Sequence, residues 1–185
     1  MALKPTILKA RVSLSDSDRG VFEDLELTLA QHPSENRQRL MARLLAYCLQ
    51  WQPALEFTRG LSTTDEPDIW QLSDAGEIQR WIEIGQPDSA RLRKACGRAQ
   101  QVLVFAYASG ADTWWSLNRE SLGKLPRTQI WQLSYPDIET ISTAVIARNM
   151  RLNISIVGGT MYIDNGEQAL DTEPQLLWES GEDGA

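Results

Sequence analysis

One run of eight residues constrains the fold more than any other part of the sequence. Residues 101–108 read Gln-Val-Leu-Val-Phe-Ala-Tyr-Ala, a continuous apolar run typical of a strand that is buried on both faces of a sheet. A helix predicted over about 89–99 precedes this run, and two strand-like runs at 68–72 and 78–84 precede that helix. Because a helix between neighbouring strands implies a parallel crossover, we expect an α/β fold with a mixed β-sheet flanked by helices.

The remaining periodic segments predict one compact domain over residues 1–175. Strands are expected near 4–14, 22–30, 55–59, 129–133, 153–157 and 160–164, and helices near 34–51, 112–124 and 134–150. Ser34 is the expected N-cap of the first helix. The middle of the chain then reads helix, three strands, helix, strand, with a β-hairpin added at each end. Residues 176–185 lose periodicity and are expected to form an acidic C-terminal tail.

The net charge of −7 comes entirely from the C-terminal stretch. The chain has 18 basic and 25 acidic residues, and seven of the acidic residues, but no Lys or Arg, lie after residue 151. Residues 1–151 therefore carry equal numbers of both charges. This distribution argues against non-specific coating of nucleic acid, but it does not exclude one local phosphate site.

Other features bound the compartment and the chemistry. The N-terminus has no apolar signal region, and no apolar run approaches the ~18 residues that a membrane span needs. Two cysteines, Cys48 and Cys96, are too few for a disulfide framework, so we expect a reduced, cytoplasmic protein. The chain has a single histidine, His32, at a predicted helix start, which disfavours nucleophilic triads.

Two carboxylates are predicted to meet in the central hairpin. With a two-residue loop at Ala75-Gly76, Asp68 directly faces Glu83 on one side of the sheet. Such a pair is tolerable when a hard cation bridges it, and Mg²⁺ favours one or two carboxylates with water and phosphate. A one-residue shift would separate the two faces. The alternative is that Glu83 simply reaches solvent or an arginine at the strand end.

The helix after this hairpin is strongly basic. Arg91, Lys94 and Arg98 fall at helical spacing and share one face, while Leu92, Cys96 and Ala99 form the apolar face. The functional interpretation is a nucleic-acid-binding wall that contacts phosphate beside the carboxylates. The alternative is an ordinary solvated face.

These segments are similar to the YaeQ family of small bacterial proteins. The similarity extends over nearly the whole chain and is carried by residues 1–4, 32–35, 55–62, 65–68, 81–88, 93–99 and 165–168. The resemblance implies a compact, single nuclease-like domain, built on a variation of the PD-(D/E)xK core with its helix–three strands–helix–strand order.

The resemblance also implies site residues, with one break in the motif. Asp68 matches the aspartate and Glu83 the second acidic residue, and both would ligate Mg²⁺. The motif lysine should lie two residues after Glu83, where this chain has glycine. Either Gln86 or Lys94 would replace it, and Glu35 matches the extra acidic residue that the first helix supplies in many relatives.

The resulting expectation is a nuclease-like protein with Mg²⁺-dependent phosphodiester hydrolysis or nucleic-acid binding. Asp68 and Glu83 would hold the metal, which would activate water. The alternative is a non-catalytic module that kept the fold and binds nucleic acid or a protein. A third interpretation is regulation through protein contacts made by the acidic tail. No membrane partner is expected.

Overall fold

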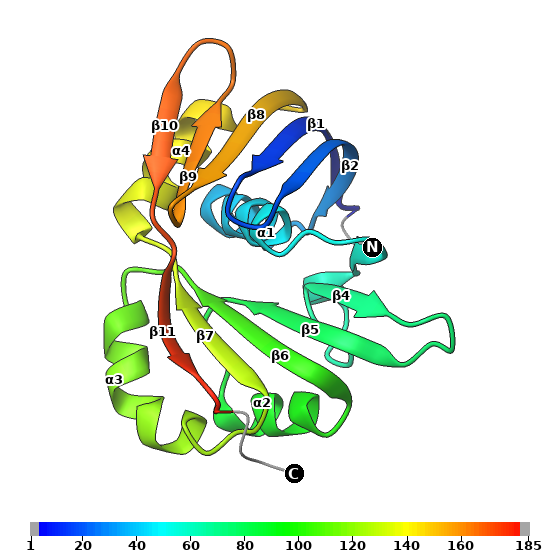
Figure 1. The fold of residues 1–185 in the computed structure, drawn as a ribbon, viewed down its shortest axis with the longest axis vertical. Coiled ribbons are helices and arrows are strands. Elements are labelled where there is room, and N and C mark those ends of the chain that lie inside the picture. The colour runs from blue at the N-terminus through cyan, green and yellow to red at the C-terminus, as the bar shows by residue number, and fades with distance from the viewer. Residues whose placement is uncertain (1–3, 182–185) are drawn as a thin grey trace. The chain divides into compact units, whose positions relative to one another are not determined.

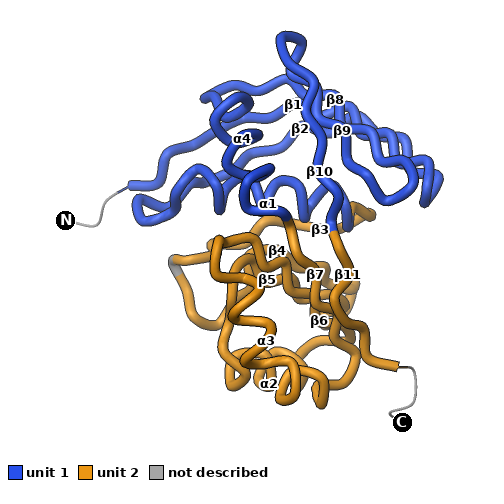
Figure 2. Tube along the Cα trace, turned by 90° about the vertical axis from the view of Figure 1, so that its left-hand side faces the viewer, with its two compact units in different colours: residues 1–50, 134–174 blue, residues 51–133, 175–185 orange. Residues whose placement is uncertain are grey.

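The computed structural model describes residues 4–181 and confirms the α/β class. It contains two mixed sheets and four α-helices in the described part of the chain, instead of the one sheet expected from the sequence (Figure 1). The chain divides into two compact units, the first from residues 1–50 and 134–174 and the second from residues 51–133 and 175–185 (Figure 2). None of the described helices is both long and apolar enough to span a membrane.

The first unit contains a five-stranded sheet in the order β10-β9-β8-β1-β2. Its elements are β1 (Thr6–Asp16), β2 (Val21–Gln31), α1 (Arg37–Leu49), α4 (Tyr135–Val145), β8 (Asn149–Val157), β9 (Thr160–Asp164) and β10 (Ala169–Thr172). The predicted N- and C-terminal hairpins are confirmed as β1–β2 and β8–β9. They are joined because β1 pairs in parallel with β8.

Alternation of side chains explains this sheet. Along β1 every second residue from Leu8 to Leu14 is buried, while Lys9, Arg11 and Ser13 face outward. Helix α1 is buried over nine consecutive residues, as its wide apolar stripe predicts. Its N-cap is Asn36, whose side chain accepts from the Arg39 amide, so the predicted Ser34 cap was wrong.

The last predicted helix was too long. Helix α4 is capped by Ser134 as expected, but it ends at Val145, and Met150 lies in β8 instead. Alternating burial from Asn149 onward continues the period of two that the hairpin sequence shows.

The second unit contains a six-stranded sheet in the order β11-β7-β6-β5-β4-β3. Its elements are β3 (Leu55–Phe57), the 3₁₀ turn η1 (Gly60–Ser62), β4 (Ile69–Leu72), β5 (Ile78–Ile84), α2 (Ser89–Cys96), β6 (Ala99–Ala106), α3 (Ala111–Leu122), β7 (Thr128–Gln132) and β11 (Gln175–Glu179). Strands β5, β6 and β7 are parallel, and the others are antiparallel to their neighbours.

The core of the second unit lies between the parallel strands and two helices. Trp81 of β5 and Val104 of β6 pack with Leu92 of α2 and Leu122 of α3. Helices α2 and α3 are therefore the crossovers of two consecutive β-α-β connections, as the sequence order predicts. Glu83 is two residues from Trp81 on β5, so it points to the same side of the sheet as α2.

The central hairpin reaches the predicted register by a different route. Ser73 accepts the amide of Gly76 and donates its own amide to Glu77, which leaves a three-residue loop instead of the predicted Ala75-Gly76. Gln79 is then an extra residue, because Leu72 pairs with Ile78 and Gln71 with Arg80. This bulge restores the predicted pairing beyond it, where Ile69 lies opposite Ile82.

The end of the chain also differs from the expected tail. Residues Gln175–Glu179 form β11, which pairs antiparallel with β7, and Ser180 bonds to Thr128. Leu176, Leu177 and Trp178 are apolar residues of the kind that form a strand. The acidic residues around them made the segment resemble a tail in the sequence. Residues 182–185 of the predicted tail lie outside the described part.

Candidate functional site

The two predicted carboxylates, Asp68 and Glu83, meet where β4 and β5 come together. The register of Ile69 with Ile82 extends by one position to place Asp68 opposite Glu83, and the Asp68 amide donates to the Ile82 carbonyl at 3.1 Å. Both residues are buried, with exposed fractions of 2% and 4%. The Asp68 carboxylate accepts the Ile84 amide through Oδ2 at 2.8 Å, which fixes it against β5.

Burial dominates the electrostatics of Glu83. Removal from water raises the pKa of this carboxyl above its ordinary value of 4.5, and the negative charge of Asp68 raises it further. The positive charge of Arg91 and two hydrogen bonds, from Trp81 and Arg91, act in the opposite direction. The Glu83 carboxylate is therefore held by specific partners in an environment that disfavours its charge.

Arg91 supplies the cation next to Glu83. Its Nε donates to Glu83 Oε1 at 2.7 Å, and Trp81 Nε1 donates to the same oxygen at 2.7 Å. Its other two nitrogens donate to the carbonyls of Thr64 and Glu66 at 3.0 and 2.9 Å. The guanidinium therefore links the Glu83 carboxylate to residues 64–66, which we call the 64–66 loop.

Helix α2 places this arginine without a long connection. Asp88 caps the helix by accepting the Arg91 amide at 2.7 Å, so Arg91 lies in the first turn. Only residues 85–88 separate that turn from the end of β5. The sequence predicted that Arg91 contacts nucleic acid. The helix cap and the short crossover are the sequence signals that could have placed it beside Glu83.

Lys94 and Arg98 contact the same loop. Lys94 Nζ donates to the Asp65 carboxylate at 2.7 Å, which lowers the pKa of Asp65. Arg98 donates to the Asp65 carbonyl at 2.8 Å, and its guanidinium lies 5.2 Å from the centre of the Trp81 ring. All three bases of the predicted wall therefore contact the 64–66 loop, and Lys94 contacts Asp65 instead of Glu83.

The other candidate for the motif lysine, Gln86, is exposed. Gly85 has a φ of 116°, a conformation that side-chain-bearing residues rarely adopt, so the predicted bend at this glycine is present. After the bend, the Gln86 amide nitrogen lies near Gly110, at the start of α3. The hydrogen bonds described above for Asp68 and Glu83 come from Ile84, Trp81 and Arg91, not from Gln86.

Glu35 belongs to the first unit and is bound there by arginines. Its carboxylate accepts Arg39 Nη1 at 3.0 Å and Arg43 Nη2 at 2.9 Å, and the residue is buried. Both arginines come from α1, which begins two residues later. These ion pairs account for a buried carboxylate without a metal.

The donor set near Glu83 does not fit a resident Mg²⁺ in this arrangement. Asp68 and Glu83 supply two carboxylates, a number that Mg²⁺ accepts, and no group of three or more His, Cys, Asp or Glu residues that could hold a metal lies within residues 4–181. The guanidinium on Oε1 of Glu83 already supplies the positive charge that a metal would bring, and it would repel a second cation. Magnesium ligation by Asp68 and Glu83 stays a prediction.

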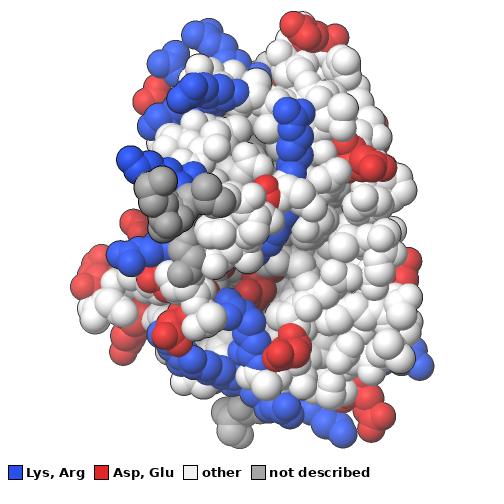
Figure 3. Space-filling model, turned by 180° about the vertical axis from the view of Figure 1, so that it is seen from behind, with Lys and Arg blue, Asp and Glu red and all other residues white. Residues whose placement is uncertain are grey.

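The sequence predicted only some of the exposed basic residues on and near α2. Arg93 donates to the Ser89 hydroxyl, Arg98 to the Asp65 carbonyl, and Arg127 to the Cys96 carbonyl. With Lys94 they form what we call the α2 basic surface; Lys and Arg side chains gather in the lower part of the view from behind (Figure 3). Arg93 and Arg127 could have been found from their place at the helix end and just before β7.

Comparison with known proteins agrees with the whole of this architecture. The family profile described as "YaeQ protein" matches residues 1–174. A protein of Escherichia coli (strain K12) named "Uncharacterized protein YaeQ" is 40% identical over 172 residues, covering 92% of this chain and 94% of that protein. Its namesake in Salmonella typhi is 40% identical over 174 residues, covering 94% and 96%.

Solved structures show the same fold. The crystal structure of YaeQ protein from Xanthomonas axonopodis pv. citri matches with a TM-score of 0.91 and 37% identity, covering 96% of this chain and 99% of that one. The crystal structure of YaeQ protein from Pseudomonas syringae matches with a TM-score of 0.89 and 32% identity, covering 97% and 98%. Because sequence, profile and structure agree along almost the full chain, this protein belongs to the YaeQ family.

Proposed function

We propose that this protein binds nucleic acid through phosphate contacts on the α2 basic surface and does not cleave it. The observation that carries the proposal is the identity of the groups that hold three of the arginines. Arg93, Arg98 and Arg127 donate to a hydroxyl and two carbonyls, and none of them forms an ion pair within residues 4–181, although the Asp65 carboxylate is near enough to Arg98 to feel its charge. Neutral acceptors orient a guanidinium while leaving its charge available to phosphate.

The same surface has the form that a polyanion requires. Several cations lie along one helix and the adjoining turn, and each phosphate contact of this kind releases counterions from nucleic acid. The nuclease-like core that the family resemblance implies supports nucleic acid over other polyanions. The neutral balance of residues 1–151 favours such local binding over broad coating.

In this proposal the protein lacks the chemical groups that hydrolysis needs. The motif lysine is replaced by Gly85, and Gln86 cannot act as a cation or a base. Arg91, the base that contacts Glu83, stays protonated and cannot accept a proton from water. Glu83, through Arg91, then holds the loop and the helix together, and Asp68 holds the Ile84 amide, instead of the two carboxylates activating water.

Binding to labelled oligonucleotides tests the proposal. Single-stranded and duplex DNA and RNA are titrated with the wild-type protein and with Arg98→Glu, and fluorescence anisotropy gives the Kd. The variant should bind about tenfold more weakly, because a phosphate contact becomes a repulsion. Arg119→Glu is the matched control, since Arg119 is an exposed arginine on α3. Equal affinity of Arg98→Glu and wild type would sink the proposal.

A second pair of variants tests the same surface with the opposite sign. Asp65→Asn removes the carboxylate that partly neutralises Lys94, so affinity should rise about twofold to threefold. Asp74→Asn, in the exposed hairpin loop, removes the same charge elsewhere in the unit and should leave affinity unchanged. A loss of affinity in Asp65→Asn would place the bound strand elsewhere.

Incubation of the same oligonucleotides with Mg²⁺ or Mn²⁺ separates binding from cleavage. The proposal expects intact substrate on a denaturing gel. Cleavage that disappears in Glu83→Gln would instead establish the hydrolytic interpretation that the motif resemblance raises.

A further inference from the structure

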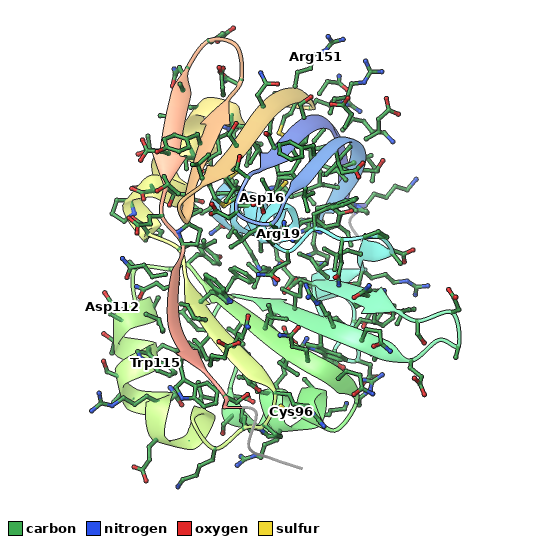
Figure 4. The ribbon with its side chains drawn as sticks, viewed as in Figure 1. Asp16, Arg19, Cys96, Asp112, Trp115 and Arg151 are labelled. Atoms are coloured by element: carbon green, nitrogen blue, oxygen red, sulfur yellow. The ribbon has the colours of Figure 1, made fainter. Side chains whose placement is uncertain are left out.

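The outer face of the five-stranded sheet carries a second group of cations, separate from α2. The buried face of β1 and β8 holds residues such as Leu14 and Ile154, and the alternation turns Lys9, Arg11 and Arg151 outward. Figure 4 shows Arg151 projecting outward from the ribbon. Lys and Arg side chains also gather at the upper left of Figure 3, over β1, β2 and β8.

Two of these cations are direct cross-strand neighbours. The parallel register of β1 and β8 pairs Arg11 with Arg151. Like charges at paired positions on one face repel each other. Arg11 has an exposed ion pair with Glu26 at 3.4 Å, whereas the Arg151 side chain has no hydrogen bond or ion pair to any residue between 4 and 181. The sheet therefore holds an incompletely neutralised pair of guanidinium groups.

Surface hollows adjoin this pair on the sheet. One hollow of about 500 Å³ is lined by both arginines and by Ser13 and Asn153. A neighbouring hollow of about 490 Å³ is lined by both arginines and by Lys9 and Asn149. Volumes of this size suit a small ligand. The asparagine amides add hydrogen-bond donors beside the cations.

We propose that Arg11, Arg151 and Lys9 bind a small ligand that carries a diphosphate or triphosphate group. One guanidinium group can bind two phosphate oxygens at once. An anion bound between Arg11 and Arg151 also offsets the repulsion between these two cations. Glu26 of β2 lines both hollows and pairs with Arg11, and Asp24 of β2 lines the first hollow and accepts from the Ser13 hydroxyl. These acids would repel an extended polyanion that crossed β2, so the charges favour a compact polyphosphate over a nucleic-acid strand.

Calorimetric titration with inorganic tripolyphosphate, in buffer without divalent cations, tests this site. Wild type should bind it, and Arg151→Glu should bind it at least about tenfold more weakly. Arg37→Glu is the matched control, because Arg37 is an exposed arginine on α1 of the same unit. Absence of binding to wild type, or equal binding to Arg151→Glu, would overturn the proposal.

Thermal unfolding separates loss of the site from loss of the fold. Arg151→Glu places an acid opposite Arg11, so its Tm without ligand should equal or exceed that of wild type. Tripolyphosphate should raise the Tm of wild type and of Arg98→Glu, but not that of Arg151→Glu. The Arg98→Glu arm keeps this result independent of the α2 basic surface. Arg151-dependent binding of an oligonucleotide without tripolyphosphate binding would contradict a compact ligand.

Discussion

Arg91 is the residue on which the candidate site depends most. It satisfies Glu83 and two loop carbonyls at once, and its side chain is 30% exposed. We expect Arg91→Ala to lower the free energy of unfolding by about 2 kcal/mol, because it leaves a buried carboxylate without its cation; partial exposure keeps the loss below that of a fully buried pair. Urea unfolding followed by tryptophan fluorescence measures it.

Lys94→Ala is the control for this loss. The Lys94–Asp65 pair is exposed at both ends, with side-chain exposures of 59% and 72%. Solvent screens such pairs, so the urea midpoint should stay nearly unchanged. Equal losses in Arg91→Ala and Lys94→Ala would mean that the Glu83 contact is not the stabilising one.

Removal of Arg91 should also open the carboxylate pair to metal. Calorimetry with Mg²⁺ should detect no binding at Glu83 in wild type, because the guanidinium occupies Oε1. Arg91→Ala should gain a weak Mg²⁺ site that disappears when Glu83→Gln is added, since Mg²⁺ accepts one or two carboxylates. Glu83-dependent binding to the wild-type protein would show that the predicted metal ligation is compatible with Arg91.

The raised pKa of Glu83 predicts a pH dependence of stability. The folded protein keeps the proton on Glu83 to a higher pH than the unfolded chain, whose value is near 4.5. Stability should therefore fall as pH rises from that value through the raised folded pKa, and then become constant. Urea unfolding of wild type and Glu83→Gln across this window gives the difference. A wild type that gains stability relative to Glu83→Gln over the same window would show a lowered pKa.

At the scale of elements, the junction between β5 and α2 sets the site. Gly85 adopts a φ of 116°, and a Cβ there would meet no atom within 4 Å. Gly85→Ala should therefore cost about 2 kcal/mol from backbone strain alone. Gly97→Ala is the control, because Gly97 has a helical φ of −76° at the end of α2. Comparison of urea unfolding curves tests this, and equal costs at both positions would remove the strain argument.

The elements show how far the sequence predicts the structure. Alternation and apolar runs locate the strands well, because they record burial directly; β1, β2, β5 and β6 are examples. Helix ends depend on local hydrogen bonds, so Asn36 replaced Ser34 as the cap. The hairpin register survived because the Gln79 bulge compensated for a longer loop, and no sequence signal announced that bulge.

The candidate site was predicted in its members but not in its contacts. Spacing along the hairpin placed Asp68 opposite Glu83, because the register of an antiparallel pair fixes which residues face each other. The spacing did not determine which basic side chain contacts Glu83, because that depends on how α2 is oriented after its N-cap. The bases at 91, 94 and 98 share a face, yet of these three it is Arg91, in the first turn, that contacts Glu83, while Arg98 lies over the Trp81 ring and Lys94 contacts Asp65.

At the scale of the whole molecule, two sheets take the place of one. The N- and C-terminal hairpins are distant in sequence and join through the β1–β8 pairing, which no local pattern predicts. The net charge of −7 likewise hides its distribution. Exposed bases with neutral partners lie around α2, and a like-charge pair lies on the five-stranded sheet. Local partners, not the total charge, decide which surfaces can accept phosphate.

The salt dependence of oligonucleotide binding is the sharpest test of phosphate contacts at the α2 basic surface. Log K for a single-stranded oligonucleotide is measured against log salt for wild type and for the triple variant Arg93→Gln, Arg98→Gln, Arg127→Gln. Each phosphate contact contributes about 0.7 to the magnitude of the slope, so the triple variant should lower that magnitude by about 2. An unchanged slope with unchanged affinity would contradict binding at the α2 basic surface.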